Sequence, residues 1–325
     1  MGHRGPWSDH RAERVLGAVA CLVLLVIAGM VVFVFEKAWP SFSANGLGFF
    51  SARGDVDLQL QDIINSPAQP DRYVYEIGAW PLLWGTFLTT GVAVLAGLAF
   101  ALLSAIFIVE LAPERLRRLL EPVVRLLAAV PSVIYGLIGV LVLVPWVGSH
   151  LASQSRRQSV EFVLQLSGGG LLVASLILTV MITPIMIAII VDALRSVPRP
   201  WMEGAAALGV NRWRVMRSIA VRAVRPAIVA AAVLATARAL GEAIMLSMVS
   251  GSVGFAPNPL DGLTFFLEPT RPLAATIVDN AEGLSVTPLA QTLYAIAALL
   301  LISSMFLSLG AWAAKRPMRR YGINP

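Results

Sequence analysis

Two opposite charges stand in one of the least polar stretches of the sequence. Arg238 and Glu242 interrupt an apolar run that extends from Pro226 to Val249. Because an α-helix turns once in about 3.6 residues, side chains four positions apart lie on one face and can form an ion pair. The planar guanidinium group also matches a tetrahedral oxyanion. The spacing therefore indicates either an ion pair that fixes helix packing or a site that binds an anion.

The elements that position this pair are expected to be membrane-spanning helices. Of the 325 residues, 57% are hydrophobic and 14% are charged, which lies outside the range of soluble globular chains. A helix needs about 20 apolar residues to cross a bilayer. We therefore predict an all-α integral membrane protein with six transmembrane helices, over residues 15–35 and about 83–109, 123–147, 170–192, 226–249 and 289–314. Arg238 would then lie near the bilayer midplane, where an arginine costs about 2.5 to 3.5 kcal/mol.

The distribution of basic residues predicts the orientation. Most of the 25 lysines and arginines fall before residue 15, between the second and third spans, between the fourth and fifth, and after residue 314. The positive-inside rule places these segments and both termini in the cytoplasm, with residues 1–14 as the cytoplasmic N-terminus and residues 36–80 as an external loop. The first span is expected to be retained and not cleaved as a signal peptide. Arginines spread over four segments exclude a nucleic-acid stripe.

Residues 193–222, between the fourth and fifth spans, form an unusual inner loop. Pro200 suits the first turn of a short helix, Gly209 suits its left-handed end, and Asn211 is a good cap for a second helix. The first helix would be lined by small residues, and Trp201 and Met202 would add large apolar contacts. This pattern predicts either an amphipathic loop on lipid headgroups or a knob that enters a cleft of another protein.

The loop resembles the EAA loop of importer permeases of the ATP-binding-cassette superfamily. The resemblance rests on Glu203-Gly204-Ala205, with Gly209 six residues after the glutamate and Ile219 ten residues further on. It implies a type I importer permease fold, in which this loop docks into a groove on an ATPase subunit. The residues implied in this docking are Trp201, Met202, Glu203, Gly204, Ala205, Ala206, Leu208 and Gly209. Gly204 and the pair Val221-Arg222 depart from the usual pattern.

The stretch from Arg238 to Glu242 is similar to one in phosphate, sulfate and molybdate permeases of that superfamily. Residues 242–251, residues 130–136 with Val144-Pro145, and residues 77–86 favour the PstC-type phosphate permeases within the group. The resemblance implies phosphate as the cargo, with sulfate or molybdate as alternatives. Arg238 and Glu242 are expected to line the pathway. Ser132 and Tyr135, beside a kink at Pro131, are candidate pore hydroxyls, whereas Met245 and Met248 suit packing.

The sequence holds no catalytic or cofactor constellation of its own. Neither lysine lies in a phosphate-binding loop of an ATPase, and the three histidines lack the spacing of metal ligands. The resemblance implies that ATP and magnesium bind to a separate cytoplasmic ATPase dimer. It also implies a homologous PstA-type permease, an external phosphate-binding protein and a location in the bacterial inner membrane. An ion-coupled secondary transporter is the alternative from another class, and a receptor or scaffold would leave Arg238 unexplained.

Overall fold

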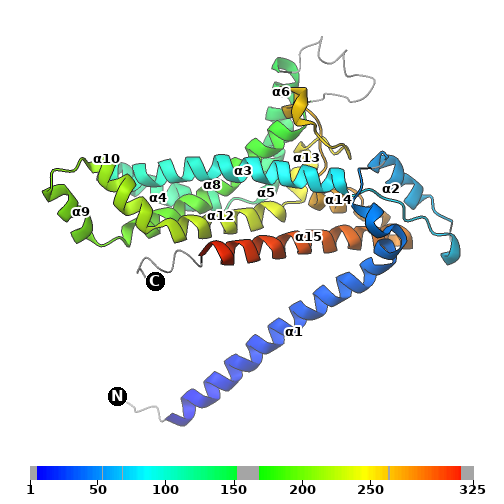
Figure 1. The fold of residues 1–325 in the computed structure, drawn as a ribbon, viewed down its shortest axis with the longest axis horizontal. Helices are drawn as coiled ribbons and strands as arrows, with labels where there is room; N and C mark the ends of the chain where they lie inside the picture. The colour runs from blue at the N-terminus through cyan, green and yellow to red at the C-terminus, as the bar shows by residue number, and fades with distance from the viewer. Residues whose placement is uncertain (1–5, 53, 68, 152–167, 263, 316–325) are drawn as a thin grey trace.

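The computed structural model describes residues 6–52, 54–67, 69–151, 168–262 and 264–315, which fold into helices (Figure 1). Within these ranges there is no strand, and one isolated bridge joins Gly251 to Thr270. Five described helices are long and apolar enough to cross a membrane. The bent pair Arg212–Ala223 and Arg225–Leu240, at 66°, makes a sixth when it is counted as one span. The predicted all-α membrane fold is confirmed.

The first half of the chain forms two long helices and several short ones. The α-helices are α1 Pro6–Asn45, α2 Val56–Ile64, α3 Trp80–Ile106, α4 Glu114–Ala128, α5 Ser132–Ile138 and α6 Val144–His150. Short 3₁₀ turns lie at Gly46–Phe50 and Pro70–Arg72, and π-helical turns at Phe107–Leu111 and Gly139–Leu143.

The second half begins with the most buried helix, α8. The α-helices are α8 Leu171–Arg195, α9 Arg199–Ala207, α10 Arg212–Val215, α11 Val221–Ala223, α12 Arg225–Leu240, α13 Ile244–Val249, α14 Leu273–Asp279 and α15 Thr287–Lys315. A π-helical turn, Met216–Ala220, joins α10 to α11. The 3₁₀ turns are Pro259–Asp261, Thr264–Phe266 and Ala281–Ser285.

The core is built around the close packing of α3 on α8. A stripe of small residues, Ala93, Gly97, Ala101 and Ala105, recurs every fourth position of α3 and is buried. A Cβ atom at Gly97 would lie 2.7 Å from the Met186 Cε atom of α8. Small side chains let two membrane helices approach closely, where packing and not hydrophobic exclusion drives association. The small residues of α3 therefore determine which face of this helix packs on α8.

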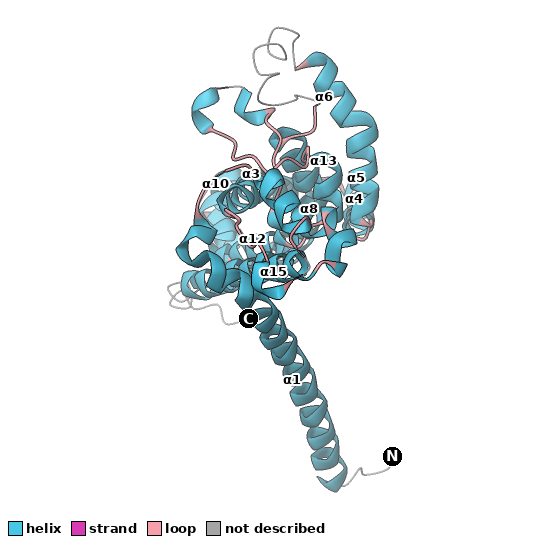
Figure 2. Cartoon of the chain, turned by 90° about the vertical axis from the view of Figure 1, so that its right-hand side faces the viewer, coloured by secondary structure: helices cyan, strands magenta, loops and turns pink. Residues whose placement is uncertain are grey.

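Helix α1 stands apart from this core over most of its length (Figures 1 and 2). No residue in the most apolar stretch of α1 is buried in this chain. Its last turns join a second hydrophobic cluster, in which Ala38 and Phe49 pack with α2 and with Leu289 and Leu293 of α15. The segment expected as the external loop, residues 36–80, thus contains the end of α1 and all of α2.

Two expected helices are interrupted. The segment expected over 123–147 ends as α4 at Ala128 and restarts as α5 at Ser132, because Pro131 lacks an N–H donor and disfavours helical geometry at the residue before it. The segment expected over 226–249 is divided after Leu240, and α13 begins at Ile244. Gly241, which has low helix propensity, lies in this second break. Both breaks lie beside the residues singled out for chemistry.

Candidate functional site

Arg238 lies in the last turn of α12, and Glu242 lies in the break between α12 and α13. The Arg238 Nε atom lies 3.9 Å from the Glu242 Oε1 atom, and the two side chains are 29% and 14% exposed. The Arg238 guanidinium has no hydrogen bond within the described residues, since 3.9 Å is too long for one. The predicted pairing is present, but it leaves the donors of Arg238 available to a ligand.

The two candidate hydroxyls lie at the other break. Tyr135 of α5 is buried, and its hydroxyl donates a hydrogen bond of 3.0 Å to the Leu127 carbonyl oxygen of α4. Tyr135 also lies within electrostatic reach of Arg238. Ser132 begins α5 and is half-buried. The Tyr135 hydroxyl, which was expected to face a pore, thus bridges the break between α4 and α5. Contact of Ser132 or Tyr135 with a pore remains a prediction.

The two breaks are joined by the packing of α13 on α5. A Cβ atom at Gly136 would lie 2.9 Å from the Met248 Sδ atom and 3.2 Å from the Met245 Cα atom. Met245 is fully buried, which is the packing role that the sequence favoured. Helix α13 begins two residues after Glu242 and packs on α5. A shift of α5 would therefore move α13 and, with it, Glu242.

This arrangement can bind an anion reversibly. A guanidinium in apolar surroundings attracts an oxyanion strongly, since charge interactions are weakly screened there. The nearby Glu242 carboxylate offsets part of that attraction. Helix breaks also leave backbone groups without intrahelical partners, which membrane proteins place where a polar path crosses the bilayer.

The second candidate site is the α9 loop, residues 196–211. Gly209 has φ +73°, a conformation open to glycine, and it ends α9 with hydrogen bonds from Gly209 N to Ala206 O (2.9 Å) and from Val210 N to Ala205 O (3.3 Å). The Asn211 side chain accepts from Trp213 N at 2.9 Å and caps α10. The loop has the bend that the sequence predicted.

The predicted contact residues of α9 do not all point outward. Trp201 is 46% exposed and Leu208 is 84% exposed, whereas Met202 is half-buried and packs against the core of its own chain. Met202 is thus less accessible than Trp201 and Leu208, and its contact with a partner remains a prediction. Gly204 has no atom near its Cβ position, and the exposed face holds Glu203, Ala206 and Gly209 as well, with Ala205 half-buried. Docking of this face on a partner remains a prediction.

Behind α9 lies a pocket of about 870 Å³, lined by charged residues of α4 and by Met202, Glu203 and Ala206. Its wall is held by an ion pair between Glu121 of α4 and Arg195 at the end of α8. The hydrogen bonds from Arg195 lower the pKa of the Glu121 carboxyl below its ordinary value. The pair therefore stays ionised at neutral pH and fixes α4 against α8 at the base of the loop.

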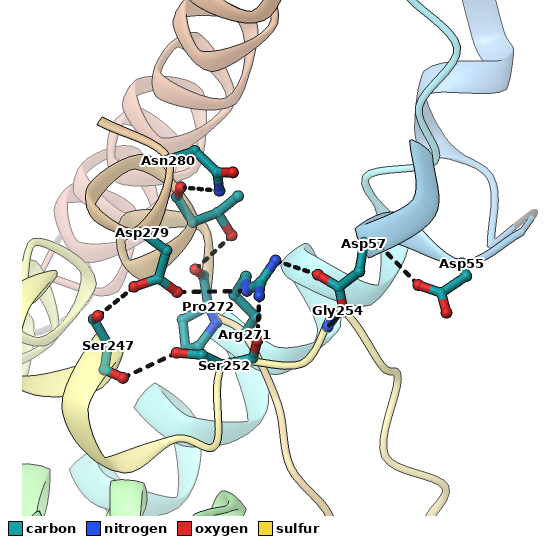
Figure 3. A network of polar contacts seen from close by, with 10 residues as sticks. Asp55, Asp57, Ser247, Ser252, Gly254, Arg271, Pro272, Asp279 and Asn280 are labelled. Carbon is teal, nitrogen blue, oxygen red and sulfur yellow. Dashed lines mark hydrogen bonds and ion pairs between the residues drawn. The ribbon is translucent and has the colours of Figure 1, made fainter. Parts of the chain in front are cut away.

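Sequence reasoning missed a polar network around Arg271 (Figure 3), which lies at the end of the molecule opposite α9 (Figure 1). Arg271 pairs with Asp57 of α2 and with Asp279 of α14, and it donates a hydrogen bond to the Ser252 carbonyl oxygen. Asp279 accepts a hydrogen bond from the Ser247 hydroxyl of α13. The Arg271 and Asp279 side chains are only 12% and 15% exposed. The network links α2 and α14 to the helix that follows Glu242.

The signal for this network was faint. In the sequence, Arg271 and Asp57 are two charges separated by 214 positions, a spacing that carries no periodicity. The one available clue is that charges are scarce in this chain, at 14% of residues. A charged residue close to apolar spans is often buried, and buried charged residues are usually paired with an opposite charge.

Comparison with solved structures defines the fold. The chain superposes on a subunit of a bacterial alginate ABC transporter, crystallised with an alginate-bound periplasmic protein, with a TM-score of 0.61 and 15% identity over 98% of this chain and 99% of that one. It superposes on a chain of the MetNI methionine ABC transporter with a TM-score of 0.54 and 18% identity, over 72% and 93%. The fold is that of an ABC transporter permease of type I.

Comparison of sequences gives the family. Residues 97–317 match the family model of the binding-protein-dependent transport system inner membrane component, and the chain belongs to this family. The phosphate transport system permease protein PstC 1 of Mycobacterium tuberculosis is 32% identical over 339 aligned positions, covering 99% of this chain and 96% of that protein. The probable ABC transporter permease protein YqgH of Bacillus subtilis is 32% identical, covering 74% and 72%. The resemblance noted in the sequence is confirmed.

Proposed function

We propose that this chain is a permease subunit through which an ATP-driven importer moves inorganic phosphate into the cytoplasm. The observation that carries the proposal is Arg238, which lies in the last turn of α12 beside a helix break, with one ion pair at 3.9 Å and no hydrogen bond within the described residues. The names of the PstC relatives support phosphate as the cargo. A membrane arginine in this setting is best explained by an anion that passes beside it.

Passage requires binding that is strong enough for entry and weak enough for release. Phosphate would accept hydrogen bonds from the Arg238 fork, which makes charge-assisted contacts with tetrahedral oxyanions. Glu242 would repel the same anion and limit how long it stays. The half-buried Ser132 and the Tyr135 hydroxyl are the further polar groups proposed for the pathway.

The proposed transporter contains further subunits, whose functions this chain does not supply. A homologous PstA-type permease would supply the other half of the pathway, and an external protein would deliver phosphate. A cytoplasmic ATPase dimer would bind ATP and magnesium, so this chain itself would be non-catalytic and without a cofactor. The α9 loop, with Trp201 and Leu208 exposed, is the proposed contact for the ATPase, in a bacterial inner membrane with both chain termini in the cytoplasm.

The test is uptake of labelled phosphate by a strain that lacks this chain, with and without a plasmid that restores it. We expect uptake to depend on the chain and to be insensitive to excess sulfate or molybdate. Copurification with an ATPase, and loss of uptake when that ATPase is inactivated, separates this function from ion-coupled transport. Normal phosphate uptake in the deletion strain, with loss of sulfate or molybdate uptake, would assign another oxyanion.

A further inference from the structure

Four exposed arginines gather just beyond the α9 loop, where α10 leads into α12. They surround a pocket of about 440 Å³ that has no acidic residue in its lining. Its lining residues are Arg214, Arg217, Ser218, Val221, Arg222 and Arg225. We refer to the four basic residues as the arginine cluster.

Local geometry places the arginine cluster on one face. The π-helical turn Met216–Ala220 has hydrogen bonds that span five residues, so a step of five from Arg217 to Arg222 returns to the same side. The opposite side carries Val215, Met216 and Ala220, which are buried against the core. The cluster is thus held by the packing of the segment behind it.

The arginine cluster has no counter-charge in the protein. None of the four side chains forms an ion pair within the part of the chain that the structure describes. Arg214, Arg217 and Arg222 lie along the continuous helical segment Arg212–Ala223, and like charges close together on a helix destabilise it. A bound anion with several acceptor oxygens would remove this repulsion.

The position of the arginine cluster indicates which kind of anion binds there. After Arg225, the chain is uncharged up to Arg238, so the arginine cluster stands where the apolar part of the span begins. Trp213, next to the cluster, is 54% exposed, and exposed tryptophan beside basic residues is typical of the depth of lipid headgroups. We propose that the arginine cluster binds a phosphate group, held as the headgroup of an anionic phospholipid. This inference does not depend on the cargo of the transporter.

The test uses the intact complex purified in a neutral detergent. Binding of phosphatidylglycerol is measured by native mass spectrometry, with phosphatidylcholine and inorganic phosphate as separate probes. The variant is Arg217→Gln with Arg222→Gln. The matched control is Arg115→Gln with Arg118→Gln, which removes two exposed arginines of α4 that lie outside this pocket. A second variant, Arg217→Lys with Arg222→Lys, keeps the charge and guards against misfolding.

We expect the glutamine variant to bind phosphatidylglycerol about 25-fold more weakly, because each basic residue near an anionic surface contributes roughly fivefold. The control should bind normally, and the lysine variant should lie between them because lysine lacks the bidentate fork. Equal affinity in all variants would overturn the proposal. So would binding of inorganic phosphate without phosphatidylglycerol, or loss of another subunit from the glutamine variant, which would make the cluster a protein contact.

Discussion

The Arg271 guanidinium is paired with the Asp57 carboxylate although 214 positions separate them in the sequence. Because Arg271 also contacts Asp279, and Asp279 holds Ser247 of α13, the pair connects α2 to the helix that follows Glu242. A movement of α2 can therefore be transmitted through these polar contacts to α13 and to the helix break beside Arg238.

Arg271→Gln is expected to destabilise the protein by about 3 kcal/mol, because it leaves the largely buried Asp279 carboxylate and the partly exposed Asp57 carboxylate without their cation. Thermal unfolding of the purified protein measures this loss. Arg72→Gln, which removes an exposed arginine, is the control and should unfold as the parent does. An Arg271 variant that unfolds at the parent temperature would show that the network contributes nothing to stability.

Arg238→Gln is expected to lower the proposed phosphate uptake by at least about tenfold, because charge-assisted hydrogen bonds to the anion are lost. Arg238→Lys should retain part of the activity, since the charge remains without the fork. Uptake and assembly of the complex are measured together. Full uptake by Arg238→Gln would place the arginine among residues that serve packing.

Gly209→Val is expected to weaken the proposed contact with the ATPase. A side chain at φ +73° costs about 1 to 2 kcal/mol and would alter the bend after α9. Copurification with the ATPase reports the effect. Gly91→Val is the matched control, because Gly91 lies within α3 with open space at its Cβ position. Equal recovery of the ATPase with both variants would argue against the α9 loop as the contact.

Glu268 gives the protein a stability component that depends on pH. Burial raises the pKa of the Glu268 carboxyl above its ordinary value of 4.5, so the folded chain holds this proton more tightly than the unfolded chain. The contribution is fully present below pH 4.5 and is lost as the pH rises through the raised pKa.

Glu268→Gln should remove this component while retaining an acceptor for the Asn258 N–H, which donates to Glu268 at 3.0 Å. Melting temperatures from about pH 4 to 7 should then decline less steeply for the variant than for the parent. Parallel curves for the two proteins would show that the carboxyl does not titrate in this range.

The sequence was sufficient to predict the features that follow local rules. The apolar runs predict the spans that become α3, α8 and α15, because a membrane solvent admits only helices that satisfy their own backbone. Gly209 and Asn211 likewise predict the bend and the cap of the α9 loop, since both depend on the residue type at one position. The ion pair of Arg238 with Glu242 follows from their spacing.

Features that depend on tertiary contacts were not predictable in this way. Pro131 signalled a kink, but the full break was not evident, because the hydrogen bond from Tyr135 to Leu127 that stabilises it is a product of the fold. Met202 turns inward because of the residues around α9, which hydropathy does not reveal. The pairing of Arg271 with Asp57 is a further case, since it depends on where the fold places α2 relative to the segment before α14.

The small-residue stripe of α3 has a consequence for studies of movement. Because Gly97 has no Cβ atom, and one built there would lie 2.7 Å from the Met186 Cε atom, α3 and α8 pack closely enough to be expected to move as one unit. Spectroscopic labels placed on this pair should report one constant separation throughout a turnover cycle, and they would serve as an internal ruler against which displacements of α1, α9 and α13 are measured.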